Sequence, residues 1–127
     1  MREITEEWIF KAENDYRSAE ALLYVIEIPI VDTACFHCQQ CAEKYVKAYL
    51  EEHDLDFPRN HNLMQLLDLC IRLDESFETI RRSLQSLEQY AVTIRYPGLR
   101  VPLDLGKKAY KTTTRVRNFV RKKLKVR

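Results

Sequence analysis

Apolar residues recur at steps of three and four positions along most of the chain, the spacing of helices that bury one face. In the first such stretch the apolar stripe consists of Trp8, Ala12, Tyr16, Ala19, Leu23 and Ile26. In the second, from about residue 32 to residue 52, it consists of Ala34, Cys38, Cys41, Tyr45 and Ala48. Thr5 and Asp32 are residue types that cap helices, so we expect the first two helices to begin there.

Three more helices are indicated in the second half of the chain. The third is expected to begin at the cap residue Asn60, and the fifth near Asp104. The fourth should end near Tyr96, because Pro97 disfavours a helical conformation in the residue before it. The apolar positions at helical spacing in these three segments are Leu63, Leu66, Leu67, Cys70, Ile80, Leu84, Leu87, Ala91, Ala109, Val116, Phe119 and Val120.

The composition also favours helices. The chain has 2 Gly and 4 Pro among 127 residues, and it lacks the Asn-Gly and Asp-Gly pairs that form tight hairpin turns. A chain of this length is large enough to bury one hydrophobic core. We therefore predict an all-α fold, an antiparallel up-and-down bundle of four to five helices that forms a single domain over residues 1–127.

Basic residues are concentrated at the C-terminal end. The net charge is +2, but residues 107–127 contain ten Lys and Arg and no Asp or Glu. The predicted basic helix, about 104–125, has two interpretations. It is either a solvated helix face or a surface for a phosphate-bearing partner or an acidic protein.

The sequence contains no recognisable targeting or membrane segment. Residues 1–10 carry charges that do not fit a signal peptide. The most apolar run, Leu22–Val31, is interrupted by Glu27 and Pro29 and is too short to cross a bilayer. We therefore expect a cytoplasmic protein with no membrane partner, whose four cysteines are thiols.

Three cysteines have a spacing that suggests a metal site, because Cys35, Cys38 and Cys41 are each separated by two residues and enclose His37. On a helix, however, positions three apart turn by about 60° per step, so these thiols do not converge on one point. The segment also lacks a Gly or Pro that would shape a loop around a metal cluster. We therefore expect no metal and no cofactor here, and we interpret Cys38 and Cys41 as small core residues.

A few polar residues are candidates for function. Arg95 and Tyr96 stand just before Pro97, where Arg offers a planar fork for phosphate and Tyr offers a ring and a hydroxyl. The alternative is that Arg95 satisfies helix carbonyls while Tyr96 packs under the loop. His37, near Lys44, and His61 are lone histidines. Such residues either serve a site or make structural hydrogen bonds.

Four separated segments resemble the HEPN domain family. Ala12–Ala19 fits the first-helix pattern A-x-x-D-x-x-x-A, and Ala34–Lys44 fits the second-helix signature A-C-F-H-x-Q-Q-x-x-E-K. Phe57–Leu63 is similar to the family's loop before the third helix, and Ile94–Pro97 is similar to its R-Y-P end of the fourth helix. The four segments occur in the family's order, and the resemblance covers roughly residues 5 to 122.

The resemblance implies a helical bundle that is usually a homodimer. It also implies a small nucleotidyltransferase as partner, in a two-component or toxin–antitoxin pair. On the basis of this resemblance, we expect the protein to be a non-catalytic module that binds a nucleotide or this partner. In that hypothesis Arg95 and Lys44 hold phosphate, Tyr96 stacks or hydrogen-bonds, and His37 and Asp15 orient neighbouring groups between the first two helices. His61 is a further tentative contact.

Two other functions remain open at this stage. The first is a toxin-like, metal-independent ribonuclease that uses Arg95 with His61 as phosphate holder and general base. The ribonuclease branch of the family carries an Arg and a His with four to six residues between them, and no histidine of this chain has an Arg five to seven positions upstream. The second is a structural dimer whose basic last helix docks an acidic partner. Whether RNA is bound is left open.

Overall fold

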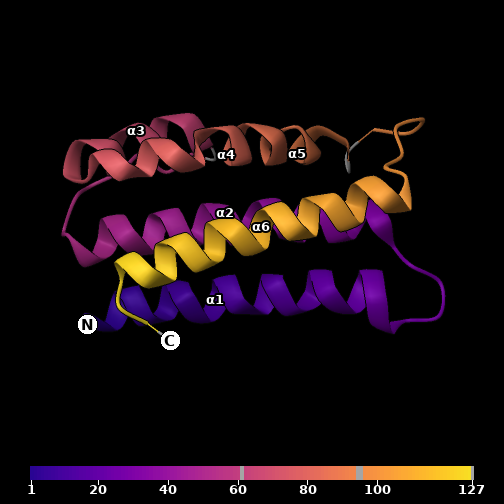
Figure 1. The fold of residues 1–127 in the computed structure, drawn as a ribbon, viewed down its shortest axis with the longest axis horizontal. Coiled ribbons are helices and arrows are strands. Elements are labelled where there is room, and N and C mark those ends of the chain that lie inside the picture. The colour runs from indigo at the N-terminus through magenta and orange to yellow at the C-terminus, as the bar shows by residue number, and fades with distance from the viewer. Residues whose placement is uncertain (61, 94–95, 127) are drawn as a thin grey trace.

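The computed structural model of the protein describes residues 1–60, 62–93 and 96–126, and within these ranges the secondary structure is helical (Figure 1). The helices are α1 (Glu3–Glu20), α2 (Val31–Glu52), α3 (Leu63–Leu73), α4 (Arg81–Glu88), α5 (Tyr90–Thr93) and α6 (Leu103–Lys123). A π-helical turn, Ala21–Val25, extends α1, and a 3-10 helix, Glu75–Ile80, precedes α4. The predicted all-α bundle is confirmed.

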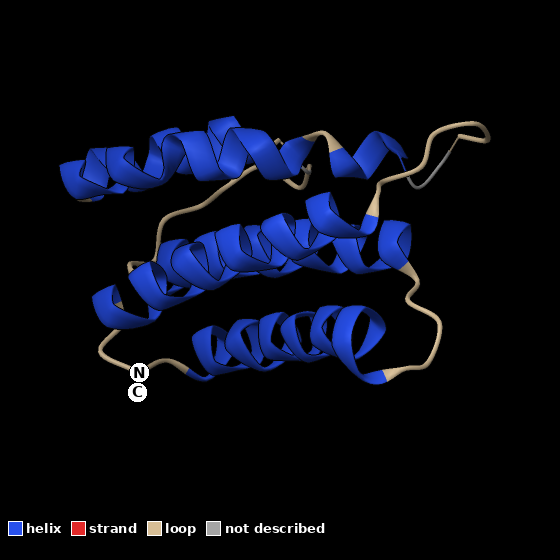
Figure 2. Cartoon of the chain, turned by 45° about the vertical axis from the view of Figure 1, so that its right-hand side comes forward, coloured by secondary structure: helices blue, strands red, loops and turns tan. Residues whose placement is uncertain are grey.

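Helix α2 lies at the centre of the bundle. Figures 1 and 2 show α3, α4 and α5 along one side, α2 and α6 in the middle, and α1 along the other side. Because α2 has neighbours on several sides, thirteen of its residues are buried. A helix that is buried around most of its circumference is the core element of its fold.

The apolar stripe predicted for α2 is confirmed, because Ala34, Cys38, Cys41, Tyr45 and Ala48 are all fully buried. The α1 stripe is correct as far as Leu23, which is buried. It is wrong at Ile26, which has an extended backbone after the π-helical turn and an exposed side chain.

The caps predicted at the first two helices are wrong. Helix α1 begins at Glu3, so Thr5 lies within it, and the Thr5 hydroxyl donates a hydrogen bond of 2.9 Å to Glu52 on α2. Helix α2 begins at Val31, and Asp32 accepts a hydrogen bond of 2.8 Å from the backbone N–H of Val101. Both side chains therefore bond to groups distant in the sequence instead of to the first turn of their own helix.

The other predicted helix starts are also displaced. Helix α3 begins at Leu63 with Asn62 as its cap, since the Asn62 side chain accepts from the backbone N–H of Gln65. Asn60 instead accepts from the backbone N–H of Asn62 at 3.1 Å. Helix α6 begins at Leu103, which places Asp104 in its first turn, where a carboxylate complements the helix dipole.

The predicted fourth helix is divided into three pieces. Its first part is the 3-10 helix, which Asp74 caps by accepting from the backbone N–H of Ser76 at 3.0 Å. Helix α4 follows, and a turn at Gln89 separates it from the short α5. Helix α5 ends at Thr93, and Tyr96, near which the helix was expected to end, lies in a bend; residues 94–95 lie outside the described residues.

All four cysteines are free and buried. Burial raises the pKa of Cys35 to about 12 and the pKa of Cys38 to about 11, and it also raises the pKa values of Cys41 and Cys70. The prediction that Cys38 and Cys41 are core residues is confirmed. Among the residues that the structure describes, no group of three or more His, Cys, Asp and Glu side chains is placed to hold a metal ion.

The apolar run from residue 22 to residue 31 lies at one end of the bundle, where it forms the π-helical turn and the connection to α2. Several of its side chains are exposed, including Val25 at 71% and Ile28 at 78%. Within the described ranges, no helix combines the length and apolar character needed to cross a membrane.

Candidate functional site

Three of the six predicted site residues meet between α1 and α2. Asp15 is buried, and its two carboxylate oxygens accept hydrogen bonds from His37 Nδ1 at 2.7 Å and from Lys44 Nζ at 2.6 Å. His37 and Lys44 are two turns apart on α2 and therefore share a face. Ala12 and Ala19, one turn on either side of Asp15, are fully buried, and their small size lets α1 approach α2 closely.

The hydrogen bonds to Asp15 determine which atoms of His37 and Lys44 remain available to a ligand. Because a carboxylate only accepts, Nδ1 of His37 donates, and Nε2 is the ring nitrogen directed away from Asp15. The His37 side chain is 27% exposed, so a ligand can reach it. The charge of Lys44 is compensated by Asp15. The cluster is therefore better suited to orienting His37 and Lys44 than to offering a free cation.

The other three predicted residues lie elsewhere. Tyr96 is in the loop between α5 and α6, where it is 58% exposed. In the described part of the chain, no hydrogen bond connects Tyr96 with Asp15, His37 or Lys44. His61 and Arg95 lie outside the described residues.

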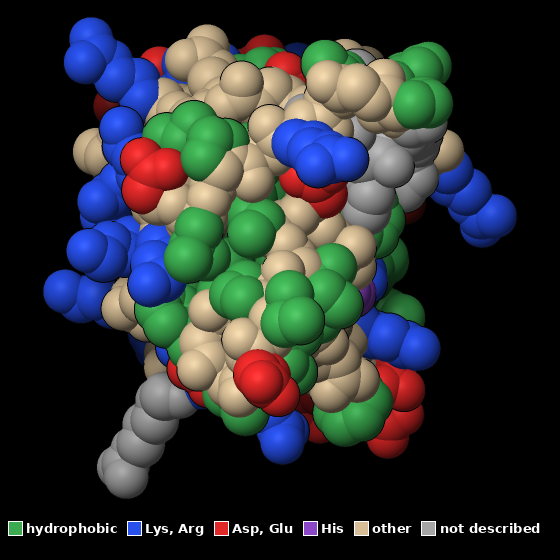
Figure 3. Space-filling model, turned by 90° about the vertical axis from the view of Figure 1, so that its right-hand side faces the viewer, with side chains coloured by type: hydrophobic (Ala, Val, Ile, Leu, Met, Phe, Trp, Pro, Cys, Tyr) green, Lys and Arg blue, Asp and Glu red, His purple; other side chains and the backbone are tan. Residues whose placement is uncertain are grey.

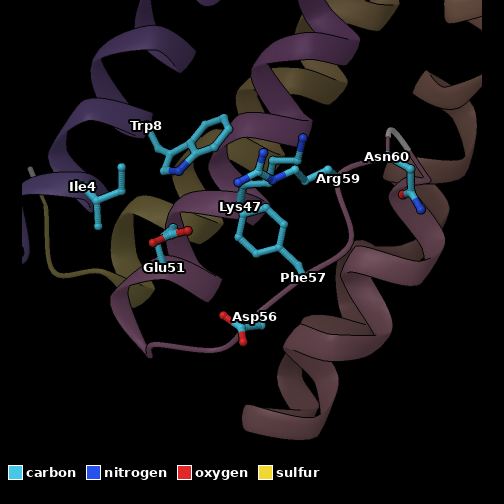
Figure 4. Close-up of a pocket in the computed structure, with 8 residues that line it drawn as sticks. All are labelled: Ile4, Trp8, Lys47, Glu51, Asp56, Phe57, Arg59 and Asn60. Atoms are coloured by element: carbon cyan, nitrogen blue, oxygen red, sulfur yellow. The ribbon is translucent and has the colours of Figure 1, made fainter.

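A pocket of about 530 Å³ opens beside the N-terminal half of α1 (Figure 4). The residues that line it are Ile4, Trp8, Lys47, Glu51, Asp56, Phe57, Arg59 and Asn60. The rings of Trp8 and Phe57 meet edge to face, with centroids 6.3 Å apart. The ammonium group of Lys47 lies 5.4 Å from the Trp8 ring centre and 5.9 Å from the Phe57 ring centre. The pocket therefore has an aromatic wall with a cation against it.

A second pocket, of about 240 Å³, adjoins the first. It is lined by Ile4, Glu7, Trp8, Lys11 and Lys44. Ile4 and Trp8 line both pockets, and Lys44 connects the second pocket to Asp15. We call the two pockets together the α1–α2 groove. The Asp15 cluster lies at one end of this groove.

The cations of the groove differ in their availability to a ligand. Lys44 and Lys47 are ion-paired with Asp15 and Glu43, at 2.6 Å and 2.9 Å. Arg59 and Lys11 have no ion-pair partner among the described residues. Figure 4 shows the Arg59 side chain extending from its loop toward Lys47 and Trp8, with Asp56 on the side of Phe57 away from Trp8. Arg59 and Lys11 are therefore the cations free to meet an anion.

Sequence reasoning missed the aromatic wall. The helical pattern predicts Trp8 as part of the core stripe of α1, and Phe57 and Arg59 stand out only as part of a segment that resembles a family loop. Helical spacing cannot indicate that residue 8 meets residue 57, because loop conformation decides that contact. The available signal was the sequence Phe57-Pro58-Arg59 in the loop that follows α2.

Together these features define a small helical-bundle protein with a candidate ligand groove between its first two helices. The HEPN domain family model matches residues 5–123, so the chain belongs to the HEPN domain family. The resemblance noted in the four sequence segments is thereby confirmed. Comparison with curated proteins and with solved structures finds no match to the chain.

Proposed function

We propose that this HEPN protein is a non-catalytic module that binds a nucleotide in the α1–α2 groove. The observation that carries the proposal is that Trp8, Phe57 and Arg59 line the same pocket. An aromatic ring offers a face on which a base stacks, and a guanidinium holds phosphate through two parallel hydrogen bonds. A volume of about 530 Å³ is within the usual range for small-molecule sites.

In this proposal the base stacks on the Trp8 side of the groove, and Arg59 and Lys11 contact the phosphates. Asp15 holds Lys44 in place at the other end, and the same carboxylate orients His37, which lines neither pocket. Arg95 and His61 remain proposed contacts from the sequence pattern. Tyr96 is left out of the groove because it lies in a different loop.

Nucleotide binding is expected to quench the fluorescence of Trp8, the single tryptophan of the chain, in a saturable manner. Arg59→Gln removes a charged hydrogen-bond donor, so it should weaken binding by about 10- to 100-fold. Arg72→Gln makes the same change in charge at an exposed position on α3 and should leave affinity unaltered. Titration with ATP, GTP and their monophosphates, followed by fluorescence and calorimetry, measures both effects. Absence of quenching and of heat with every nucleotide would contradict the proposal.

The ribonuclease alternative is distinguished by a direct assay. It assigns the chemistry to Arg95 and His61, so RNA incubated with purified protein would be cleaved, and His61→Ala would abolish cleavage. Intact RNA together with saturable nucleotide binding favours the non-catalytic module.

We also propose that the protein is a homodimer. The supporting observation is a cluster of exposed apolar side chains at one end of the bundle, which Figure 3 shows face on. The cluster is formed by Tyr24, Val25, Ile26, Ile28, Ile30, Tyr96, Leu99, Leu103 and Leu105. Its two loops lie together, since Ile30 and Arg100 line a common hollow. Large exposed apolar patches mark interaction sites.

The Ile28→Asp substitution is expected to convert the dimer to a monomer, because it places a carboxylate in the middle of the proposed interface. Leu73→Asp, at an exposed leucine where α3 ends, is the matched control and should leave the dimer intact. Light scattering coupled to size-exclusion chromatography measures the mass directly. A monomeric wild-type protein across the accessible concentration range would refute the proposed dimer.

The proposed partner is a small nucleotidyltransferase, as membership of the HEPN family suggests. Co-expression with a nucleotidyltransferase encoded beside this chain, followed by co-purification, tests this part of the proposal. If the two proteins elute separately at all concentrations, the partner is of another kind.

A further inference from the structure

The exposed face of α6 carries a regular row of positive charges. The row follows steps of three and four residues, so its side chains lie one above another on a single helix face. Its members on α6 are Lys108, Lys111, Arg115, Asn118 and Lys122, and Lys125 follows in the turn after the helix; all six side chains are exposed. With a helical rise of 1.5 Å per residue, the part of the row on α6, from Lys108 to Lys122, is about 21 Å long. We call it the α6 stripe. Figure 3 shows Lys and Arg side chains gathered along the left edge of the molecule, where α6 lies.

The stripe is distinct from the basic residues of α6 that support the fold. Those residues contact other helices or aromatic rings: Lys107 lies over Tyr24, Arg117 pairs with Glu13, Arg121 donates to Tyr45, and Lys123 pairs with Asp74. In contrast, none of the five cations of the stripe has an ion-pair partner among the described residues. Arg115 makes a hydrogen bond of 3.3 Å to Thr112 on its own helix. The positive charge of the stripe is therefore not neutralised within the fold.

A hollow of about 440 Å³ lies at the C-terminal end of the stripe. It is lined by Ser76, Thr79, Phe119, Lys122, Lys123 and Lys125. Lys123 is paired with Asp74 at 2.8 Å, which leaves Lys122 and Lys125 as the cations free to meet a ligand. Two unpaired ammonium groups beside one concave surface are suited to hold a phosphate group.

We propose that the α6 stripe and its hollow bind the phosphate backbone of a double-stranded nucleic acid, independently of sequence. None of the six stripe residues is apolar or aromatic. Protein interfaces, by contrast, are depleted in lysine and depend on aromatic or apolar anchors. Lysine and arginine without such anchors are the groups that contact phosphates and position a protein on a duplex. These properties favour a nucleic acid over an acidic protein face.

The aromatic residues of α6 favour a duplex over a single strand. Tyr110 stacks on Tyr16 with ring centres 5.0 Å apart, and Phe119 meets Phe77 at 5.1 Å. Each ring is thus packed against another ring of the protein, although Phe119 also borders the hollow, whereas proteins that bind single strands stack unpaired bases on free aromatic rings. Each strand of a duplex presents one charge per about 3.4 Å of the axis, so a row of about 21 Å spans roughly six phosphates of one strand.

Fluorescence anisotropy with short labelled RNA and DNA duplexes tests the proposal. We expect binding at about 50 mM salt that weakens steeply toward 200 mM, with a slope in log K against log salt near −4 for four to five neutralised phosphates. The double variant Lys111→Gln/Lys122→Gln should reduce the magnitude of this slope by about 1.8 and weaken binding at least tenfold. Equal affinity for RNA and DNA identifies the shared backbone as the ligand, and a preference identifies which nucleic acid is recognised.

Control variants test whether a loss of duplex binding is specific to the α6 stripe. Arg72→Gln/Arg82→Gln removes the same charge from exposed positions on α3 and α4 and should change neither affinity nor slope. Arg59→Gln, in the α1–α2 groove, should also leave duplex binding unaltered, so failure of nucleotide binding and failure of this proposal are distinguishable. Absence of duplex binding, an equal loss in the control, tighter binding of the single strands, or stronger competition by polyglutamate than by duplex would overturn the proposal.

Discussion

Replacing Lys47 with methionine is expected to lower the free energy of unfolding by about 3 kcal/mol, because it removes the ammonium that compensates a buried carboxylate. Lys47 Nζ lies 2.9 Å from Glu43 Oε2, and Glu43 is 1% exposed. Gln39 donates to the other carboxylate oxygen at 3.2 Å. Urea unfolding followed by circular dichroism measures the change.

Two further variants separate the ion pair from simple packing. Glu43→Gln/Lys47→Met has no buried charge at either position, so it should recover most of the stability lost in the single variant. Lys111→Met, at an exposed lysine of α6, should change stability by less than about 0.5 kcal/mol. If Lys47→Met lowered the free energy of unfolding as little as Lys111→Met, the Glu43–Lys47 ion pair would contribute no more to stability than a surface contact.

Gly106→Val is expected to destabilise the protein by about 2–3 kcal/mol, because Gly106 lies where α6 meets the start of α2. A Cβ atom at this position would stand 2.5 Å from Cγ1 of Val31 and 3.1 Å from Cδ2 of Leu23. Valine is stiff at χ1, so neither it nor Val31 can rotate away easily. Thermal and urea unfolding both report the effect.

A second substitution can relieve the steric clash that Gly106→Val introduces. Val31→Ala removes the nearest methyl groups, so Gly106→Val/Val31→Ala should be more stable than the sum of the two single effects. Lys111→Val places the same residue at an exposed position of α6 and should cost less than about 0.7 kcal/mol, its loss of helix propensity. Strict additivity of the two changes at 31 and 106 would show that the contact is not tight.

The sequence pattern predicted the bundle but underestimated the burial of α2. Periodicity indicates one apolar face, and Glu43 and Lys47, an i,i+4 pair, lie on another face of the helix, for which the pattern predicts exposure. The structure places helices on several sides of α2, so this pair is buried as well. The predicted starts of the first two helices were wrong for a related reason. Thr5 and Asp32 have the chemistry of caps, but their hydrogen bonds go to Glu52 and Val101, which local pattern cannot indicate.

The candidate site was predictable where it depends on two regular helices. Asp15, His37 and Lys44 lie on facing stripes of α1 and α2, and the structure brings them together. The aromatic wall was not predictable, because its position depends on how the loop after α2 folds back over α1. Phe57 and Arg59 reach Trp8 only through that loop.

The four buried thiols have a consequence for how opening of the bundle can be observed. Thiol alkylation requires an accessible thiolate, and burial with raised pKa values withholds both from Cys35, Cys38, Cys41 and Cys70. Three of these residues lie on α2 and the fourth on α3, so they become reactive when the centre of the bundle separates. The rate of alkylation of the native protein therefore measures how often α2 is exposed, without any added probe.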